Sequence, residues 1–323
     1  MTTERTPVLY VGGLGRSGST LLNRLLGQVP GHVAVGELVY LWEHSLTRDH
    51  ECGCGKRFMA CEFWSSVGKH AFGGWQNIEG SEIFALQRSV ASASYIPLLI
   101  APRLWPAFNT RVQRYADVMG RLFEGIRLAS GANVIVDSSK YPAPLYLLRH
   151  VRGIDLRVVH IVRDPRGVAY SWSKKVRRPE QGTAAEEDMP IWSARLVARR
   201  WLTTNALMTL LGKLGVPVLE LRYEDLVRDP SSHIQRIVEF MDQPLPADGL
   251  HFIGDGWAEL VPAHTADGNP MRFATGRTKI RVDEAWREKL PDSRRRVVEA
   301  WTWPLRRHYG YGPLERTPDL TSV

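Results

Sequence analysis

The sequence contains little cysteine and no long apolar run. Only 3 of its 323 residues are cysteines, all between Cys52 and Cys61, which excludes the disulfide framework of a small secreted domain. No stretch approaches the roughly 18 uninterrupted apolar residues of a membrane-spanning helix. The first residues also lack the charged and apolar regions of a secretory signal. We therefore expect a cytoplasmic protein without integral membrane association.

The sequence also lacks internal repeats and low-complexity tracts. Its hydrophobic content of 44% and charged content of 24% indicate a folded core rather than disorder. The net charge of +8 favours an anionic ligand. The arginine clusters 294–296 and 306–307 are typical of the solvated face of a helix, so we expect no nucleic-acid partner. The Arg-, Ala- and Gly-rich composition is typical of a bacterial protein with high genomic GC content.

Short apolar segments alternate with helical ones. The predicted strands are 8–11, 133–136, 156–162 and 217–222, and the predicted helices are 19–26, 191–214, 229–241 and 284–307, the last split at Pro291. Because the crossovers between strands exceed ten residues, we expect an α/β fold with a parallel sheet covered by helices on both faces. We interpret residues 1–323 as one domain. Within it, residues from about 40 to 130 would be a mainly helical insertion that shapes an acceptor site, and residues 177–188 a polar loop, either a lid or an ordinary surface loop.

A glycine-rich turn over residues 12–20 follows the first strand and precedes a helix. Such a turn presents backbone N–H groups to a phosphate. Gly13, Gly15 and Gly18 fit the dinucleotide pattern G-x-G-x-x-G, and Glu37 lies where a ribose-binding acid would be expected. A nucleotide-triphosphate loop would need a lysine before Ser19, and that lysine is missing. The turn alone therefore allows an NAD(P)-dependent oxidoreductase, a silent nucleotide-binding protein or another phosphate-binding enzyme.

A second anion site is predicted after the strand 156–162. Arg163 ends this strand, and Ser171 follows eight residues later, about two helical turns away. A guanidinium donates two parallel hydrogen bonds to a phosphate. Two anion sites at neighbouring strand ends indicate a nucleotide that carries phosphates on both sides of its ribose. NAD would not require the second site.

Four motifs in this order resemble the sulfotransferases that use 3′-phosphoadenosine 5′-phosphosulfate (PAPS), especially the bacterial branch similar to protein-tyrosine sulfotransferases. The motifs are the 15–20 loop, the segment 163–171, the segment 221–226 with its tyrosine, and the clamp 268–273. The resemblance implies a P-loop-like sulfotransferase fold and transfer of a sulfonate from PAPS to an acceptor hydroxyl, without a metal ion. The acceptor class stays open among small molecules, glycans, lipids and peptides, as does the oligomeric state.

The resemblance also implies roles for individual residues. Glu37 would be the general base, with His44 or His50 as alternatives, while Lys140 and Arg16 would stabilise charge during transfer. The residues implied in cofactor binding are Gly15, Arg16, Ser17, Gly18, Ser19, Thr20, Arg163, Ser171, Tyr223 and Arg272.

The cysteine-rich segment raises the question of a zinc site. Cys52, Cys54 and Cys61 are flanked by His50 and His70, and three thiols with one histidine can hold zinc. The spacing C-x-C-x₆-C is not that of a standard zinc finger, however. We therefore expect reduced thiols packed against nearby aromatic side chains, and no metal ligand.

Overall fold

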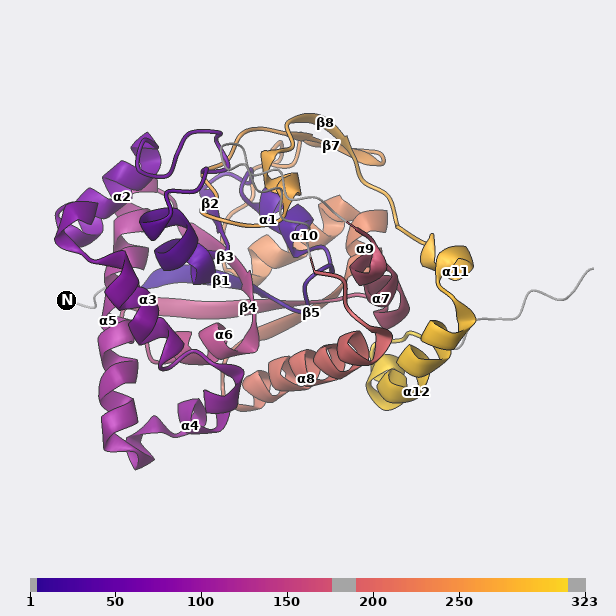
Figure 1. Ribbon diagram of the computed structural model, residues 1–323. Helices are drawn as coiled ribbons and strands as arrows, with labels where there is room; N and C mark the ends of the chain where they lie inside the picture. The colour runs from indigo at the N-terminus through magenta and orange to yellow at the C-terminus, as the bar shows by residue number, and fades with distance from the viewer. Residues whose placement is uncertain (1–4, 176–189, 313–323) are drawn as a thin grey trace, which may run out of the picture.

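The computed structural model describes residues 5–175 and 190–312, so the predicted polar loop 177–188 lies outside the described residues. Its central feature is a five-stranded parallel sheet with the strand order β2-β3-β1-β4-β5 (Figure 1). The strands are β1 (Thr6–Gly12), β2 (His32–Gly36), β3 (Val134–Lys140), β4 (Ile154–Val162) and β5 (Val218–Arg222). The predicted parallel α/β fold is confirmed.

The central strand β1 shows why the sheet is buried on both faces. Val8 and Tyr10 point into one apolar cluster, while Leu9 and Val11 point into another, and all four are fully buried. Successive side chains of a strand alternate between faces, so an unbroken apolar run requires helices on both sides. Helices α5, α6 and α8 cover the first face, and α1 and α10 cover the second.

Most predicted elements agree with the structure within a few residues. The helices of the sheet and of the C-terminal region are α1 (Ser19–Leu26), α6 (Pro142–Leu148), α7 (Pro165–Ser173), α8 (Ala194–Lys213), α9 (Tyr223–Arg228), α10 (Pro230–Phe240), α11 (Trp286–Lys289) and α12 (Asp292–His308). The break at Pro291 separates α11 from α12, as predicted. The short edge strand β2 is not among the predicted strands, and β3 continues to Lys140, four residues beyond its predicted end.

The region between β2 and β3 is mainly helical, as expected. It contains α2 (Glu62–Phe72), α3 (Gly80–Arg88), α4 (Ile96–Ile100) and α5 (Pro106–Ser130). Pro106 begins the 25-residue helix α5, since a proline at the first helical position costs no hydrogen bond. Helices α2 and α5 cross closely, since a Cβ atom on Gly125 would lie 2.7 Å from the Cβ atom of Ala71.

A small antiparallel sheet, which was not predicted, lies near α1. It consists of β6 (Ile253–Gly254), β7 (Trp257–Leu260) and β8 (Gly276–Lys279). The buried Arg24 of α1 donates hydrogen bonds to the carbonyl groups of Val261, Arg272 and Ala274. Through these bonds α1 holds the segment that follows β7 beside the carboxyl end of the main sheet.

No single helix among the described residues is long and apolar enough to cross a membrane. The helical segments 80–88 and 93–100, which are bent by 53° relative to each other, reach the length and apolar character of a membrane span only when taken together.

Candidate active site

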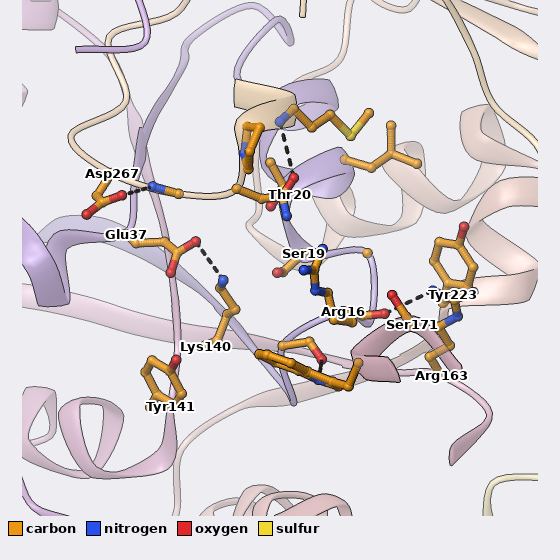
Figure 2. Close-up of a pocket in the computed structure, with 18 of the residues that line it drawn as sticks. Arg16, Ser19, Thr20, Glu37, Lys140, Tyr141, Arg163, Ser171, Tyr223 and Asp267 are labelled. Carbon is orange, nitrogen blue, oxygen red and sulfur yellow. Dashed lines mark hydrogen bonds and ion pairs between the residues drawn. The ribbon is translucent and has the colours of Figure 1, made fainter. Parts of the chain in front are cut away.

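A cleft of about 420 Å³ opens at the carboxyl ends of the parallel strands (Figure 2). Ligands of open parallel sheets bind at this edge. Loops after β1, β2, β3 and β4 contribute to the cleft, as does the segment 267–281. Five lysine and arginine side chains and two carboxylates line the cleft. The cations are Arg16, Lys140, Arg163, Lys279 and Arg281, and the carboxylates are Glu37 and Asp267. This excess of positive charge suits an anionic ligand.

The turn between β1 and α1 can be formed only with glycine at two positions. Gly13 has a φ of 148°, and a Cβ atom there would lie 2.3 Å from the carbonyl oxygen of Ile161. Gly18 caps α1 with a φ of 93°, and a Cβ atom there would lie 2.4 Å from the Tyr223 ring. Glycine adopts such conformations without strain. The turn therefore packs against both β4 and Tyr223 and presents the N-terminus of α1 to the cleft.

Arg16 adopts a left-handed conformation with a φ of 74°, which is uncommon for a residue with a side chain. Its guanidinium lies 5.3 Å from the centre of the Trp172 ring. The Trp172 indole donates a hydrogen bond of 3.0 Å to the Gly15 carbonyl. Trp172 of helix α7 therefore packs against the glycine-rich turn and beside the Arg16 side chain, which lines the cleft.

Arg163 joins the turn to the second predicted anion site. Its guanidinium donates a hydrogen bond of 3.0 Å to the Arg16 carbonyl and lies 4.5 Å from the centre of the Tyr223 ring. It also contacts the Asp283 carboxylate at 3.3 Å. Ser171 lines the same cleft from α7, two turns after Arg163. The predicted meeting of Arg163 and Ser171 in one cleft with the glycine-rich turn is thus observed.

Glu37 and Lys140 form a buried ion pair at the other end of the cleft. The Lys140 Nζ atom lies 2.6 Å from the Glu37 Oε1 atom, and the two side chains are 12% and 4% exposed. Burial raises the pKa of Glu37, and the positive charge of Lys140 opposes that rise without cancelling it. Burial tends to lower the pKa of Lys140, but Glu37, Tyr141 and Asp267 together outweigh that effect, so the pKa is raised. The positive charge of Lys140 can therefore keep the Glu37 carboxylate ionised although burial disfavours a charged group there.

The backbone around Glu37 is held from two sides. The Glu37 N–H donates to the carbonyl of Asp267. On the other side, the Val39 N–H donates to the Ser139 hydroxyl, which itself donates to the buried Asp137 carboxylate. Burial raises the pKa of Asp137 to about 7, against the hydrogen bonds from Ser139. Ser139 is thus a positioning residue that ties the turn after β2 to the end of β3.

Two tyrosines and a histidine form an aromatic wall beside Glu37. The Tyr40 ring stacks on the His44 ring with a centre distance of 4.8 Å, and the Tyr40 hydroxyl is 3.1 Å from that of Tyr141. The His44 ring is hydrogen-bonded to the Asp267 carboxylate. Tyr40 and His44 belong to a 3₁₀ turn and a π-helical segment at the start of the 40–130 region. This wall offers apolar rings and hydroxyl groups to a ligand next to Glu37.

The predicted site residues line the cleft, except for Ser17, Arg272 and the alternative base His50. The Ser17 side chain is buried and does not line the cleft. Arg272 does not line the cleft either. Its guanidinium donates a hydrogen bond of 3.0 Å to the Ala266 carbonyl and lies beneath the loop 268–271, whose residues do line the cleft. Sequence reasoning missed Tyr40, Tyr141, Asp267, Lys279 and Arg281. Lys279 and Arg281 could have been suspected from the sequence, because they are basic residues soon after the predicted clamp 268–273. A single tyrosine such as Tyr40 or Tyr141 has no comparable sequence pattern.

The family comparison agrees with this geometry. The family model described as "Sulfotransferase family" matches residues 7–247, and the chain belongs to this family. The matched region contains the glycine-rich turn, the Glu37–Lys140 pair and the Arg163–Ser171 segment. The resemblance inferred from the sequence is therefore confirmed at the level of the family, and the family is not that of the dinucleotide-binding oxidoreductases.

Individual relatives agree. The chain is 31% identical over 160 residues to carbohydrate sulfotransferase 4 of Mus musculus, covering 46% of this chain and 39% of that protein. It is 28% identical over 187 residues to carbohydrate sulfotransferase 6 of Homo sapiens, covering 53% and 45%. The chain thus spans less than half the length of these relatives. Its fold resembles the sulfotransferase domain of the Synechococcus PCC 7002 olefin synthase, with a TM-score of 0.52, 23% identity and 97% coverage of both chains.

Proposed function

We propose that the protein is a PAPS-dependent sulfotransferase that transfers the sulfonate group to an acceptor hydroxyl. The observation that carries the proposal is the placement of the Glu37–Lys140 pair in the same basic cleft as the glycine-rich turn and Arg163. The turn and α1 would hold the 5′-phosphosulfate. Arg163 and Ser171 would hold the 3′-phosphate, and the Tyr223 ring would lie beside the adenosine.

The proposed reaction is an in-line displacement at sulfur. The acceptor oxygen forms a bond to the sulfur atom while the bond from sulfur to the 5′-phosphate oxygen breaks. Glu37 accepts the proton of the acceptor hydroxyl, and 3′-phosphoadenosine 5′-phosphate (PAP) leaves. Lys140 and Arg16 would stabilise the negative charge that develops on the leaving oxygen. These residues supply the base and the positive charge from the chain itself, so we propose a transfer step that requires no metal ion.

Glu37 is favoured over His44 as the base. The Glu37 carboxylate is paired with a lysine that can also reach toward the leaving group, whereas the His44 ring is engaged by Asp267 and Tyr40. Burial of Glu37 brings its pKa closer to neutral, which improves a carboxylate as a general base.

We propose that the acceptor binds against the aromatic wall of Tyr40, His44 and Tyr141. The start of the 40–130 region provides two of these rings, which supports the proposal that this region shapes the acceptor site. The names of the carbohydrate sulfotransferases favour a sugar hydroxyl, and aromatic rings pack well against sugar rings. Phenols, lipid hydroxyls and tyrosyl peptides belong in the same acceptor panel.

Calorimetric titration with PAP, without added divalent metal, tests the cofactor assignment. We expect PAP to bind and NAD and ATP to bind far more weakly. Arg163→Ala should weaken PAP binding by about 10- to 150-fold, since hydrogen bonds to charged groups contribute about 1.5–3 kcal/mol. Arg199→Ala, on the exposed face of α8, is the matched control and should leave binding unchanged. Tight NAD binding with no PAP binding would overturn the proposal.

A further inference from the structure

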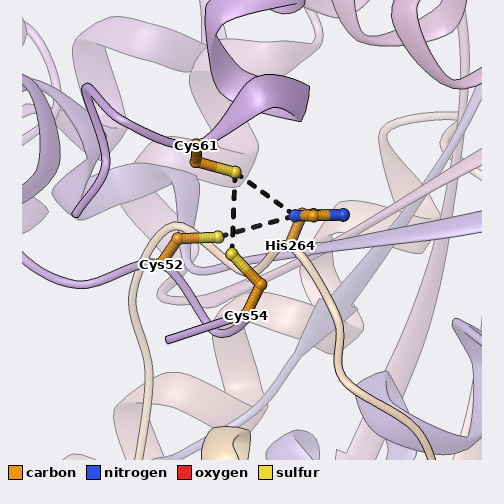
Figure 3. A group of neighbouring side chains, drawn as sticks. All are labelled: Cys52, Cys54, Cys61 and His264. Carbon is orange, nitrogen blue, oxygen red and sulfur yellow. Dashed lines mark hydrogen bonds between the residues drawn. The ribbon is translucent and has the colours of Figure 1, made fainter. Parts of the chain in front are cut away.

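Three cysteines and one histidine from distant parts of the sequence converge outside the cleft (Figure 3). Cys52 and Cys54 come from the loop before α2, Cys61 is the N-cap residue of α2, and His264 comes from the segment after β7. Their Sγ and Nδ1 atoms all lie within 4.8 Å of one another. Nothing in the proposed sulfonate transfer uses them. We propose that these four residues hold a structural zinc ion.

Three distances between the four ligand atoms are close to those of a tetrahedral site. With Zn–S bonds of about 2.3 Å and a Zn–N bond of about 2.05 Å, a tetrahedron has S···S edges of about 3.8 Å and S···N edges of about 3.5 Å. The Cys54 and Cys61 sulfur atoms are 3.7 Å apart. The His264 Nδ1 atom lies 3.3 Å from the sulfur of Cys61 and 3.9 Å from that of Cys52. An ion fits between them with little movement.

The backbone of the cysteine loop is shaped to bring these atoms together. A Cβ atom on Gly53 would lie 2.2 Å from the Thr265 hydroxyl and 2.6 Å from the Ala263 carbonyl, so only glycine allows this approach. The Gly53 N–H donates to the Thr265 carbonyl. Gly55, with a φ of 84°, closes the turn by donating to the Cys52 carbonyl. The two segments that carry the ligands are thus joined by a backbone hydrogen bond directly after His264 and pack closely at Ala263, directly before it.

Other features favour a closed structural site over a reactive thiol. Cys52 and Cys61 are fully buried, and all three cysteines are free. The 3.7 Å between the Cys54 and Cys61 sulfur atoms is far longer than the roughly 2.05 Å of a disulfide. The Phe63 ring stacks on the His264 ring at a centre distance of 5.0 Å. Four protein ligands leave no open position, which is typical of structural rather than catalytic zinc.

Three of the four proposed ligands lie close together in the sequence, and the fourth does not. The spacing C-x-C-x₆-C with His50 or His70 as the fourth ligand did not favour a metal. The structure replaces those two histidines with His264, which lies 203 residues beyond Cys61. A fourth ligand so far along the sequence can be identified only from the fold, which brings the segment after β7 next to the start of α2.

The proposed ion would fasten one wall of the cleft. Ala266 lies two residues after His264, and its N–H donates to the carbonyl of Val35 in β2 while its own carbonyl accepts from the Ser45 hydroxyl. The next residue, Asp267, accepts from the Glu37 N–H. Zinc at His264 would therefore clip the cysteine loop to the segment that positions Glu37 and leads to the loop 268–271.

Metal analysis of the full chain tests the site. Purified under reducing conditions and without chelator, the protein should contain about one zinc ion per chain. His264→Gln and Cys54→Ser should lose that zinc, while His70→Gln, on the exposed end of α2, is the matched control and should retain it. The native protein should also release zinc and expose three thiols together when treated with an organomercurial.

Wild-type protein alone can overturn the proposal, so a variant that fails to fold does not obscure the result. Zinc below a tenth of an equivalent, with three thiols titrating freely in the native chain, would show that the thiols are only packed. One remaining thiol would show a disulfide instead. Either result leaves PAP binding untouched, which separates failure of the zinc proposal from failure of the cofactor assignment.

Discussion

The Lys140 ammonium lies 2.6 Å from the Glu37 carboxylate, and both groups are buried at the floor of the cleft. The two residues come from different strands of the sheet, because Lys140 ends β3 and Glu37 follows β2. Lys140 reaches this position with a left-handed φ of 69°. An uncommon backbone conformation at both Lys140 and Arg16, two cations of one cleft, is typical of a functional site.

We expect Glu37→Gln to lower turnover by about 10²- to 10⁴-fold, which is the usual contribution of a general base. The amide keeps the shape of the side chain and can still accept a hydrogen bond from Lys140, so PAP affinity should not change. Glu239→Gln is the matched control, because that exposed carboxylate of α10 accepts a hydrogen bond from Gln235 and does not line the cleft. Unchanged turnover in Glu37→Gln would remove Glu37 from the mechanism.

We expect Lys140→Met to move the acid limb of the rate profile to higher pH. The base must be ionised, so activity falls as pH drops through the pKa of Glu37. Burial already raises that pKa, and Lys140 lowers it, so loss of Lys140 raises it further, by about 1–3 pH units. The measurement is kcat/KM from pH 5 to pH 9. Lys279→Met removes another cation of the cleft and should leave the acid limb where it is in the wild type.

Substitution of the alternative base distinguishes the two candidates. Because His44 is held by Asp267 and stacked on Tyr40, we expect His44→Gln to raise the KM for the acceptor and to lower kcat by less than about tenfold, below the range of a general base. Steady-state kinetics with saturating PAPS separates the two parameters. A loss in kcat as large as that of Glu37→Gln would make the histidine the base.

The architecture could be predicted because local signals for it are strong. Continuous apolar runs such as 8–11 predict buried parallel strands, and the glycines after that run predict the tight turn between β1 and α1. The short edge strand β2 was missed because its apolar part is three residues long and resembles a loop. The predicted strand 133–136 ends before β3 does, because Asp137 and Ser139 are polar and polar residues usually end a buried strand. Both are buried, however, and the Ser139 hydroxyl donates a hydrogen bond to the Asp137 carboxylate.

The site was predicted less completely than the fold. Motif spacing identified Arg163, Ser171 and Glu37, whose positions depend on neighbouring strands. It could not identify Asp267 or His264, because nothing local in the sequence shows that the segment after β7 returns to the end of β2. The Arg272 guanidinium donates to the Ala266 carbonyl beneath the loop 268–271, and its role in cofactor binding stays a prediction.

A buried histidine in the sheet gives a prediction on stability. His160 of β4 is fully buried and lies 2.8 Å from the Asn205 side-chain oxygen. Burial lowers the pKa of His160 to about 4, whereas an unfolded histidine titrates near 6.5. Between these values the unfolded chain binds the proton and the folded chain does not, so stability falls as the pH drops from about 6.5 to 4.

We expect this one residue to make the free energy of unfolding about 2 kcal/mol smaller at pH 5 than at pH 7. Urea unfolding at both pH values measures the difference. In His160→Gln, whose amide can still donate to Asn205, the loss between pH 7 and pH 5 should be smaller than in the wild type by that amount, whatever the other titrating groups contribute. His70→Gln, an exposed histidine on α2, should keep the wild-type loss. If His160→Gln loses as much stability as the wild type, the buried ring is not the group that takes up the proton on unfolding.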